Sequence, residues 1–303
     1  MNKPKNLPDG GRIAIVAPSG AIAPEYLDKG IALIQSKGYS VEVMPHVRDC
    51  RTGVFAATDA QRASDMEEAI LRDDIDAIIC ARGGYGAVRT IQHMKKSVVQ
   101  RCDKWLVGFS DITVFHSALT HYGIASIHGP MLKHIAVHGI DSDDVKKTFD
   151  LMRGKKVSVS CESAQYSRSG KVSGKLIGGN LSLIYSLRRT AIDIAPKGAI
   201  LFIEDLSEYN YHIDRMMQNL KYSGVLSKLG GLIVGQMTDM KDGATAFGSD
   251  AYAIIADAVA QYDYPVLMGY PAGHADEVNM PLRMGGEATL RVDAKGQSSL
   301  TFA

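Results

Sequence analysis

Short apolar runs that alternate with amphipathic segments constrain the fold of this chain more than any other feature. In the first half, the apolar runs are expected to form buried strands at residues 12–17, 41–44, 77–81, 105–108 and 125–128. The segments between them are expected to form helices at residues 24–37, 58–71 and 112–122. Strands that alternate with helices build a parallel sheet with helices on both faces. Ligands bind such a sheet at the carboxyl ends of its strands, so we expect the functional residues there.

A polar, serine-rich stretch at residues 153–174 has little helical periodicity and marks the expected domain boundary. We therefore predict one α/β domain at residues 1–155 and a second domain at residues 170–303, because a chain of 303 residues is long enough for two. The second half mixes strands with helices. Its expected strands are residues 171–177, 199–204, 231–235, 266–269, 288–292 and 298–302, and its expected helices are residues 181–187, 213–222 and 249–261.

Charge and composition argue against several classes of function. The formal net charge is only +1 and the basic residues form no cluster longer than a pair, so we expect no nucleic-acid partner. No apolar run approaches the length of a membrane span, and the first apolar run is too short for a signal peptide. The 4 cysteines have no C-x-x-C spacing, which is typical of reduced thiols. We therefore expect a cytoplasmic protein that does not bind a membrane.

The candidate nucleophile is Ser110, which follows an apolar run that ends at Gly108. A sharp strand-to-helix turn would expose its Oγ and would leave the backbone N–H of Asp111 at the helix start, where it could stabilise an oxyanion. The turn is not the G-x-S-x-G of α/β-hydrolases, because Ile112 replaces the second glycine. Serine is also a preferred helix cap, so a plain capping role is the alternative.

A second strand-like run ends in the glycine-rich turn Gly83-Gly84-Tyr85-Gly86. It does not fit a phosphate-binding loop, because the G-x-G-x-x-G spacing and a following Lys-Ser or Lys-Thr are missing. Half of an oxyanion hole fits better, since glycine lets a backbone N–H approach a developing negative charge. We favour Gly84 as the donor, with Gly83 as the second choice. A simple turn that needs positive φ is the alternative.

A serine nucleophile needs a base and a third group that orients the base. Among the 9 histidines, His274 has the most loop-like setting, whereas His116 lies on the helix after the nucleophile and His128 ends a strand. Glu204 is expected at the end of a buried strand, where a carboxylate needs a partner. That partner could be a cation such as Arg215 or a helix N-terminus.

Other chemistries fit the sequence less well. Cys80 lies inside an apolar strand, where a free cysteine usually acts as a small hydrophobic residue rather than a nucleophile. His134 and His138 have helical i, i+4 spacing, but the glutamate of the H-E-x-x-H zinc motif is missing. We therefore expect neither a metal nor a cofactor.

Several ordered motifs, spread over nearly the whole chain, resemble those of the LD-carboxypeptidases. These are serine peptidases that trim murein peptides, and their family also contains the microcin C self-immunity peptidases. The matching segments are Arg82-Gly83-Gly84-Tyr85-Gly86, Gly108-Phe109-Ser110-Asp111, Gly129-Pro130, Gly178-Gly179-Asn180-Leu181, Glu204-Asp205, Asp214-Arg215-Met216 and Gly273-His274 with Asn279 and Pro281.

The resemblance implies a flavodoxin-like N-terminal domain and a smaller, β-rich, barrel-like C-terminal domain, with the active site between them. It implies a triad in which Ser110 attacks, His274 is the base and Glu204, rather than Asp205 or Glu208, orients the imidazole. The expected substrate is a murein tetrapeptide that loses its terminal D-alanine in cell-wall recycling. We expect a homodimer.

The resemblance also suggests residues that bind the substrate. Arg82 could bind the terminal carboxylate in a bidentate manner, although a structural pairing with an acid is equally compatible with the sequence. Glu208 could recognise an ammonium group of the substrate or could be a solvated loop carboxylate. Relatives usually carry a proline just after this position, where the chain has Tyr209-Asn210-Tyr211, so the shape of the pocket is open.

Three other functions remain as alternatives. A microcin-type peptidase would cleave an aminoacyl-nucleotide conjugate, but the single tryptophan, Trp105, is expected in a core strand and cannot stack on a nucleotide. A non-catalytic protein that binds peptidoglycan fragments or nucleotides could use the same scaffold. A glutamine-amidotransferase-like hydrolase would require cysteine in place of Ser110.

Overall fold

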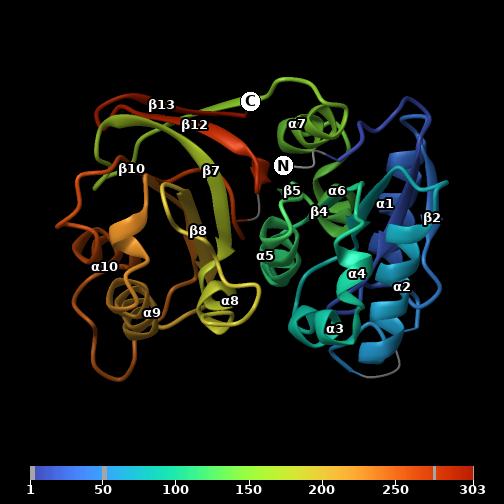
Figure 1. Ribbon diagram of the computed structural model, residues 1–303, viewed down its shortest axis with the longest axis horizontal. Coiled ribbons are helices and arrows are strands. Elements are labelled where there is room, and N and C mark those ends of the chain that lie inside the picture. The colour runs from blue at the N-terminus through green and yellow to red at the C-terminus, as the bar shows by residue number, and fades with distance from the viewer. Residues whose placement is uncertain (1–3, 50–52, 276–277, 303) are drawn as a thin grey trace. The chain divides into compact units, whose positions relative to one another are not determined.

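The computed structural model describes residues 4–49, 53–275 and 278–302 of the chain. The chain divides into two compact units (Figure 1). Unit 1 comprises Met1–Lys156 and Met280–Gly285, and unit 2 comprises Val157–Asn279 and Gly286–Ala303. The chain therefore leaves unit 1 after residue 156, returns to it for residues 280–285 and then continues in unit 2.

Unit 1 contains a six-stranded sheet with the strand order β11-β5-β4-β3-β1-β2. All neighbouring strands are parallel except β11, which pairs antiparallel with β5. The strands are β1 (Arg12–Val16), β2 (Ser40–Val43), β3 (Ala77–Cys80), β4 (Trp105–Gly108), β5 (Ser126–His128) and β11 (Leu282–Met284). Every residue of β3, β4 and β5 is buried, as expected of strands that are covered on both faces.

The helices of unit 1 fall into groups that contact one another. Helix α1 packs against α6, whereas α2 contacts α3 and α4, and α3 contacts α5. These helices are α1 (Pro24–Gln35), α2 (Asp59–Leu71), α3 (Ala87–His93), α4 (Lys96–Val99), α5 (Thr113–His121), α6 (Leu132–His138) and α7 (Asp143–Met152). Thr58 caps α2 in a capping box with Gln61, which satisfies backbone N–H groups that the helix leaves unpaired.

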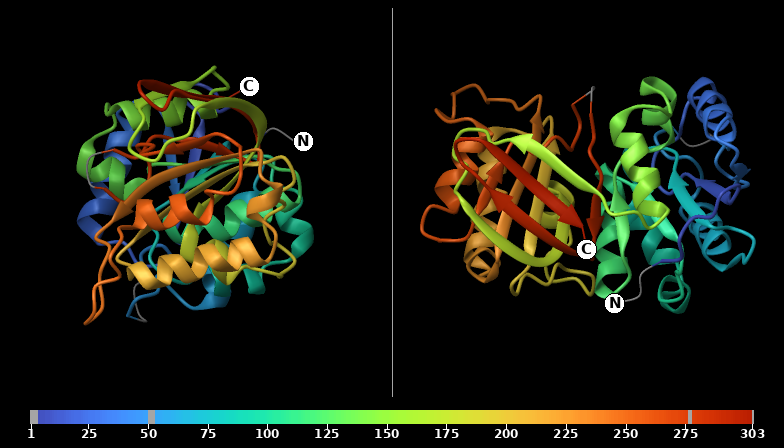
Figure 2. Two further views of the ribbon diagram at one scale, coloured as in Figure 1. Left: turned by 90° about the vertical axis from the view of Figure 1, so that its left-hand side faces the viewer. Right: turned by 90° about the horizontal axis from the view of Figure 1, so that it is seen from above.

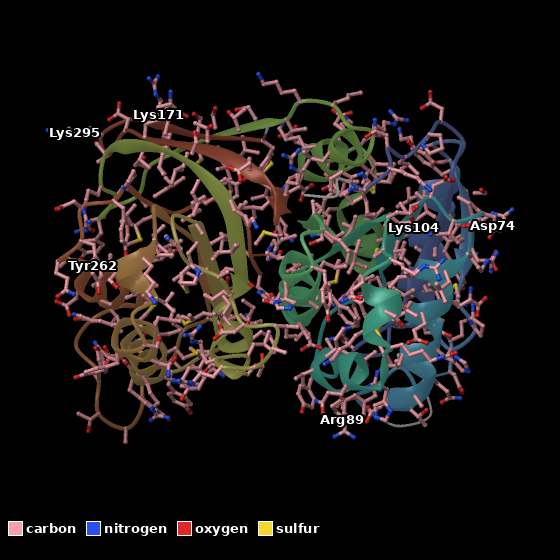
Figure 3. All side chains as sticks on the ribbon, in the orientation of Figure 1. Asp74, Arg89, Lys104, Lys171, Tyr262 and Lys295 are labelled. Atoms are coloured by element: carbon pink, nitrogen blue, oxygen red, sulfur yellow. The ribbon has the colours of Figure 1, made fainter. Side chains whose placement is uncertain are left out.

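The exposed ends of α2 and α3 are joined by an ion pair. Arg89 of α3, labelled in Figure 3, donates to Asp59 of α2 with an Nη2–Oδ2 distance of 2.6 Å. Asp59 also accepts from the buried Arg62, at 2.5 Å. This arrangement fixes the short helix α3, which begins directly after the Gly83–Gly86 turn.

Unit 2 contains a seven-stranded sheet with the strand order β10-β9-β8-β7-β12-β13-β6. The strands are β6 (Ser158–Glu162), β7 (Gly170–Asn180), β8 (Ile200–Leu206), β9 (Gly231–Thr238), β10 (Val266–Met268), β12 (Glu287–Val292) and β13 (Gln297–Phe302). The long strand β7 joins two halves of the sheet, because residues 170–175 pair antiparallel with β12 and residues 176–180 pair parallel with β8. Figure 2 shows the strong curvature of this sheet.

The two edges of the unit 2 sheet approach closure. The segment after β6 runs along β10, where Arg168 and Val266 exchange both backbone hydrogen bonds. The parallel half of the sheet packs against three helices in one hydrophobic core. These helices are α8 (Leu181–Ser186), α9 (Asn210–Tyr222) and α10 (Ala251–Ala258). Because its two sheet edges meet at Arg168 and Val266, unit 2 is barrel-like.

The expected α/β fold class is confirmed, and most expected elements are present. Trp105, Met216 and Met217 are fully buried, as core residues should be. The sequence analysis did not predict β6, which lies in the polar stretch 153–174, or the three-residue strand β11. It also missed the short helices α3, α4 and α6. No helix among the described residues is long and apolar enough to cross a membrane.

Candidate active site

Ser110 occupies a strained turn between β4 and α5. The backbone is extended at Phe109, where φ is −147°, and then reverses at Ser110, where φ is +63°. A 3₁₀ turn, η1 (Ser110–Ile112), leads directly into α5. Positive φ is uncommon outside glycine and clusters at functional sites, where it presents a side chain that a regular helix would not. The sharp strand-to-helix turn expected from the sequence is therefore present.

The end of β4 is fixed by a neutral histidine. His116 of α5 bonds the carbonyl of Gly108 through Nε2 at 2.8 Å and the hydroxyl of Ser126 through Nδ1 at 2.8 Å. Because a carbonyl only accepts, Nε2 carries the proton. Burial lowers the pKa of His116 to about 4, so the ring is neutral at physiological pH. His116, which the sequence placed on the helix after the nucleophile, is thus a buried residue that holds the end of β4.

The glycine turn after β3 lies directly against Ser110. A methyl group added at Gly83 would lie 2.9 Å from the Cβ of Ser110 and 3.0 Å from its Oγ, so only glycine fits. Gly84 has a φ of +104°, which a residue with a Cβ rarely adopts. Gly20, in the loop after β1, donates its backbone N–H to the carbonyl of Gly83 at 3.0 Å. This bond ties the turn to the loop after β1.

Arg82 makes a structural contact at the start of this turn. Its Nη1 donates to the carbonyl of Ala21 at 3.1 Å. A guanidinium has five N–H donors, and this contact uses one. Among the described residues, the partner of the Arg82 guanidinium is this backbone carbonyl.

Glu204 and His274 form a buried hydrogen-bonded pair in unit 2. Glu204 lies near the end of β8 with 0% of its side chain exposed, and its Oε2 lies 2.7 Å from Nδ1 of His274. The His274 side chain keeps 13% of its surface exposed. A carboxylate on Nδ1 holds the proton there and leaves Nε2 as the basic nitrogen. The arrangement is that of a general base with its orienting acid.

Electrostatics at this pair favour the charged imidazole. Burial alone lowers the pKa of His274, but the charge and hydrogen bond of Glu204, with a contribution from Asp205, outweigh burial and raise it above its usual value. An imidazolium that forms as His274 takes up a proton is therefore stabilised by Glu204. Such stabilisation is what a base needs during proton transfer.

The loop that carries His274 is clamped by Gln236 of β9. Its Oε1 accepts from the N–H of Ala275 at 2.9 Å, and its Nε2 donates to the carbonyl of Val278 at 3.3 Å. Asn279 accepts from the N–H of Gly273 at 3.1 Å. Sequence analysis gave no role to Gln236, because a lone glutamine at the end of a strand carries no pattern that points to a loop.

The other two acids considered for the triad have different partners. Asp205 accepts from Asn180 at 2.9 Å and from the hydroxyl of Ser182 at 2.7 Å. Burial and the neighbouring charge of Glu204 raise the pKa of Asp205 to about 6. Glu208 accepts from Ser182 at 3.1 Å and bonds Nδ1 of His212 at 2.5 Å. Of the three acids, Glu204 is the one that bonds Nδ1 of His274.

The residues considered for a thiol nucleophile, a zinc site or a cation beside Glu204 have other contacts in the structure. Cys80 is fully buried, and burial raises the pKa of its thiol far above the usual range. His134 pairs with Asp144 at 2.8 Å. The guanidinium of Arg215 lies 5.3 Å from the centre of the Tyr211 ring rather than beside Glu204. In the part of the chain that the structure describes, no group of 3 or more His, Cys, Asp or Glu residues could hold a metal ion.

Each unit therefore gathers one part of the predicted site. In unit 1, Arg82 and Gly84 lie on the turn that faces Ser110 and Asp111. In unit 2, Glu204 bonds His274, and Glu208 lies two residues after the end of β8.

Comparison with known proteins assigns both halves of the chain to one family. Residues 13–129 match the LD-carboxypeptidase N-terminal domain, and residues 173–290 match the LD-carboxypeptidase C-terminal domain. A probable murein peptide carboxypeptidase of Bacillus subtilis is 29% identical over 97% of this chain and 92% of its own length. The murein tetrapeptide carboxypeptidase of Pseudomonas aeruginosa is 29% identical over 88% of this chain and 89% of its own.

Solved structures show the same fold. The muramoyltetrapeptide carboxypeptidase of Oxalobacter formigenes is 30% identical and superposes with a TM-score of 0.86 over 96% of this chain and 98% of its own. A microcin C7 self-immunity protein in complex with aspartyl sulfamoyl adenosine has a TM-score of 0.83 over 97% of both chains. That protein is only 20% identical, so the likeness concerns the fold alone.

Proposed function

Because the chain belongs to the LD-carboxypeptidase family, we propose that it is a serine carboxypeptidase that removes the terminal D-alanine from murein tetrapeptides. The relatives named for murein peptides support this substrate class. The observation that carries the proposal is the buried Glu204–His274 pair, since its 2.7 Å bond supplies an oriented base. The strained turn at Ser110 supplies a matching nucleophile.

The proposed reaction is acyl transfer through a Ser110–His274–Glu204 triad. Nε2 of His274 takes the proton of Ser110 as its Oγ attacks the carbonyl carbon of the L-to-D peptide bond. His274 then gives that proton to the nitrogen of D-alanine, which leaves. A water molecule, deprotonated by His274, hydrolyses the ester and restores the serine. Glu204 holds the imidazole through its hydrogen bond and stabilises the imidazolium.

The proposed oxyanion hole consists of backbone N–H groups of Gly84 and Asp111. Asp111 is the second residue of the helical turn that begins at Ser110, and N–H groups of a first helical turn have no partner within their own helix. Such groups suit the negative charge that develops on the carbonyl oxygen. The closeness of the glycine turn to Ser110 is the support for Gly84.

We assign substrate binding to Arg82 and Glu208. The guanidinium of Arg82 can bind the carboxylate of the terminal D-alanine, and Glu208 can pair with the ammonium group of the diamino acid in the peptide. In the proposed division of labour, residues 1–155 carry the nucleophile, and residues 170–303, apart from the segment 280–285 that belongs to unit 1, carry Glu204 and His274. We further propose a cytoplasmic homodimer that acts in cell-wall recycling.

The decisive experiment is peptide hydrolysis by the wild-type chain and by Ser110→Ala. Murein tetrapeptides that contain L-lysine or meso-diaminopimelate are incubated with each protein, and the loss of one alanine is followed by mass spectrometry. We expect wild-type turnover and a decrease of about 10⁴-fold or more in kcat for Ser110→Ala, because loss of a triad nucleophile has that effect. Release of D-alanine by the variant within a few-fold of wild type would end the proposal.

The same assay tests the microcin-type alternative. An aminoacyl sulfamoyl adenosine, the class of compound bound to the microcin C7 self-immunity protein, is offered as a competing substrate. Hydrolysis of this compound with no hydrolysis of tetrapeptides would favour the alternative. Binding of murein peptides without turnover of either compound would favour a non-catalytic protein.

A further inference from the structure

The carboxylate of Asp111 is buried beside the nucleophile and bonds two other segments. Asp111 is only 1% exposed. Oδ2 accepts a hydrogen bond from the hydroxyl of Ser19 at 2.6 Å and another from the backbone N–H of Ala87 at 2.7 Å. Ser19 and Ala87 are themselves 0% exposed. All of these contacts lie within unit 1.

The bonded segments are those that surround Ser110. Ser19 lies in the loop after β1, and Ala87 is the first residue of α3, directly after the Gly83–Gly86 turn. Asp111 itself follows Ser110. The loop after β1 is tied to the turn a second time, because Gly20 donates to the carbonyl of Gly83 at 3.0 Å. One carboxylate therefore joins the nucleophile turn to both neighbouring loops.

A carboxylate at this position is costly for the fold. Burial raises the pKa of Asp111, and its bonds to Ser19 and Ala87, with the charge of Arg62, only partly oppose that effect. A buried carboxylate is tolerated where it is hydrogen-bonded or paired. Here the hydrogen bonds connect the start of η1 with the loop after β1 and with the first residue of α3, directly after the glycine turn.

We propose that the Asp111 carboxylate is a positioning residue that holds the Gly83–Gly86 turn against Ser110, so that the backbone N–H groups of Gly84 and Asp111 converge on one oxyanion. This role rests on the proposed function and adds to it a side chain that does not touch the substrate. Oxyanion donors act because they are fixed before the charge develops. A turn released by loss of this carboxylate keeps its donors but not their direction.

The effect should appear in kcat rather than in KM. Asp111→Ala removes both hydrogen bonds, and we expect kcat on a murein tetrapeptide to fall about 10- to 100-fold, since small misplacements or a lost oxyanion donor have effects of this size. KM should change by less than about 3-fold, because the proposed binding groups Arg82 and Glu208 are unchanged. Asp111→Asn keeps an oxygen that can accept from Ser19 and Ala87, so it should retain kcat within about 5-fold.

A transition-state analogue separates positioning from stability. A peptide boronic acid, in which boron replaces the scissile carbonyl of the diamino acid that precedes D-alanine, forms a tetrahedral adduct on a serine oxygen and needs the oxyanion hole. For Asp111→Ala its inhibition constant should rise about 10- to 100-fold, while the affinity for the tripeptide product changes less than about 3-fold. Ser19→Ala, which removes one of the two bonds, should give an intermediate increase.

Asp65→Ala is the matched control in the full chain. Asp65 lies in the same unit, is 3% exposed and accepts from the N–H of His46 at 3.0 Å and from its Nδ1 at 2.7 Å. Its loss should lower Tm in the same way but leave kcat and the boronate affinity of the folded protein unchanged.

The outcomes separate the inference from the proposed function. Absence of peptide turnover and of a boronate adduct in the wild-type chain would refute the proposed function before any Asp111 variant is measured. An active wild type with an Asp111→Ala variant that loses Tm but keeps kcat and boronate affinity within about 3-fold would overturn the positioning role. If Asp111→Ala does not fold, Ser19→Ala decides, and unchanged boronate affinity in that variant would equally overturn the role.

Discussion

The carboxylate of Glu204 determines how His274 titrates. Its charge and hydrogen bond raise the pKa of the imidazole although burial acts in the opposite direction. A raised pKa in the folded chain means that protonation of His274 stabilises the fold. That stabilisation is complete below the usual histidine pKa of about 6.5 and is lost as the pH rises through the higher folded value. The base that catalysis needs is the neutral form, so activity should change in the opposite sense.

We predict that the acid limb of kcat/KM reports the pKa of His274. In the wild type, kcat/KM should rise with pH through a midpoint above about 6.5. Glu204→Gln removes the charge but leaves the burial, so the midpoint should move to lower pH while the rate falls steeply. Activity profiles, together with NMR titration of the His274 ring, measure both effects.

Glu208→Gln is the matched control for the titration. Glu208 bonds Ser182 and His212 and is not among the groups that shift the pKa of His274. This variant is expected to change substrate binding and to leave the midpoint in place. An equal midpoint in wild type and Glu204→Gln would contradict the assignment of Glu204.

The choice among neighbouring acids shows a limit of the sequence at the residue scale. Glu204 and Asp205 are adjacent in β8, at a register shift between Ile203 and Asp205, so regular strand alternation does not predict which partner each one has. The pattern of residues does not reveal which face carries the histidine. The structure shows it, because Glu204 bonds His274 while Asp205 bonds Asn180 and Ser182.

At the scale of elements, two turns that follow parallel strands carry the residues of unit 1 that are proposed for catalysis. The turn after β3 and the turn after β4 touch at Gly83 and Ser110. Their positions followed from the sequence, because strand-like runs that end in glycine are visible without a structure. Their mutual contact did not, since it depends on the neighbouring places of β3 and β4 in the sheet.

We predict that Gly83→Ala damages activity more than stability. The added methyl group would lie within 3.0 Å of the Ser110 Oγ, so either the serine or the turn must move. Loss of kcat/KM should reach about 100-fold, whereas overpacking of this kind costs about 1–3 kcal/mol of unfolding free energy. Hydrolysis assays and thermal unfolding measure the two effects.

Gly243→Ala serves as the control for the added methyl group. At Gly243 the nearest atom to an added Cβ is the carbonyl oxygen of Thr245, at 3.8 Å, so the methyl group meets no obstacle. Its activity should equal that of wild type. Full activity in Gly83→Ala would show that the contact with Ser110 is not needed for attack.

Short elements account for most of what the sequence analysis missed. Strand β11 has three residues and helix α4 has four, and such lengths show neither a two-residue nor a 3.6-residue period. Burial alternates along strand β6, with Val159 buried between exposed neighbours. Most of its residues are therefore polar, and the segment does not stand out as a strand. Edge and barrel strands of this kind are defined by their partners in the sheet rather than by their own composition.

At the scale of the whole molecule, the chain does not divide into consecutive domains. Residues 280–285 belong to unit 1, although residues 157–279 before them and residues 286–303 after them belong to unit 2. Strand β11 supplies the outermost strand of the unit 1 sheet and pairs with β5, where Leu282 lies opposite His128. A boundary read from composition near residue 155 cannot reveal such a return, because the three residues Leu282-Arg283-Met284 carry no pattern that assigns them to either unit.

We predict that Leu282→Ala destabilises unit 1 at strand β5, which lies about 150 positions earlier in the chain. Leu282 is 0% exposed, and truncation of a buried leucine to alanine costs about 2–5 kcal/mol. Because β11 covers the edge of β5, the backbone N–H groups of Ser126–His128 should exchange with solvent faster in the full-length variant. Hydrogen–deuterium exchange with mass spectrometry measures this change.

Leu290→Ala is the matched control for that exchange experiment. Leu290 is equally buried, but it lies in β12 and faces Val172 of β7 and Leu300 of β13, all in unit 2. Its loss should speed exchange in β7 and β13 and leave β5 protected. If both variants instead raised exchange equally in β5 and β7, the two units would open together, and β11 would have no specific part in holding unit 1.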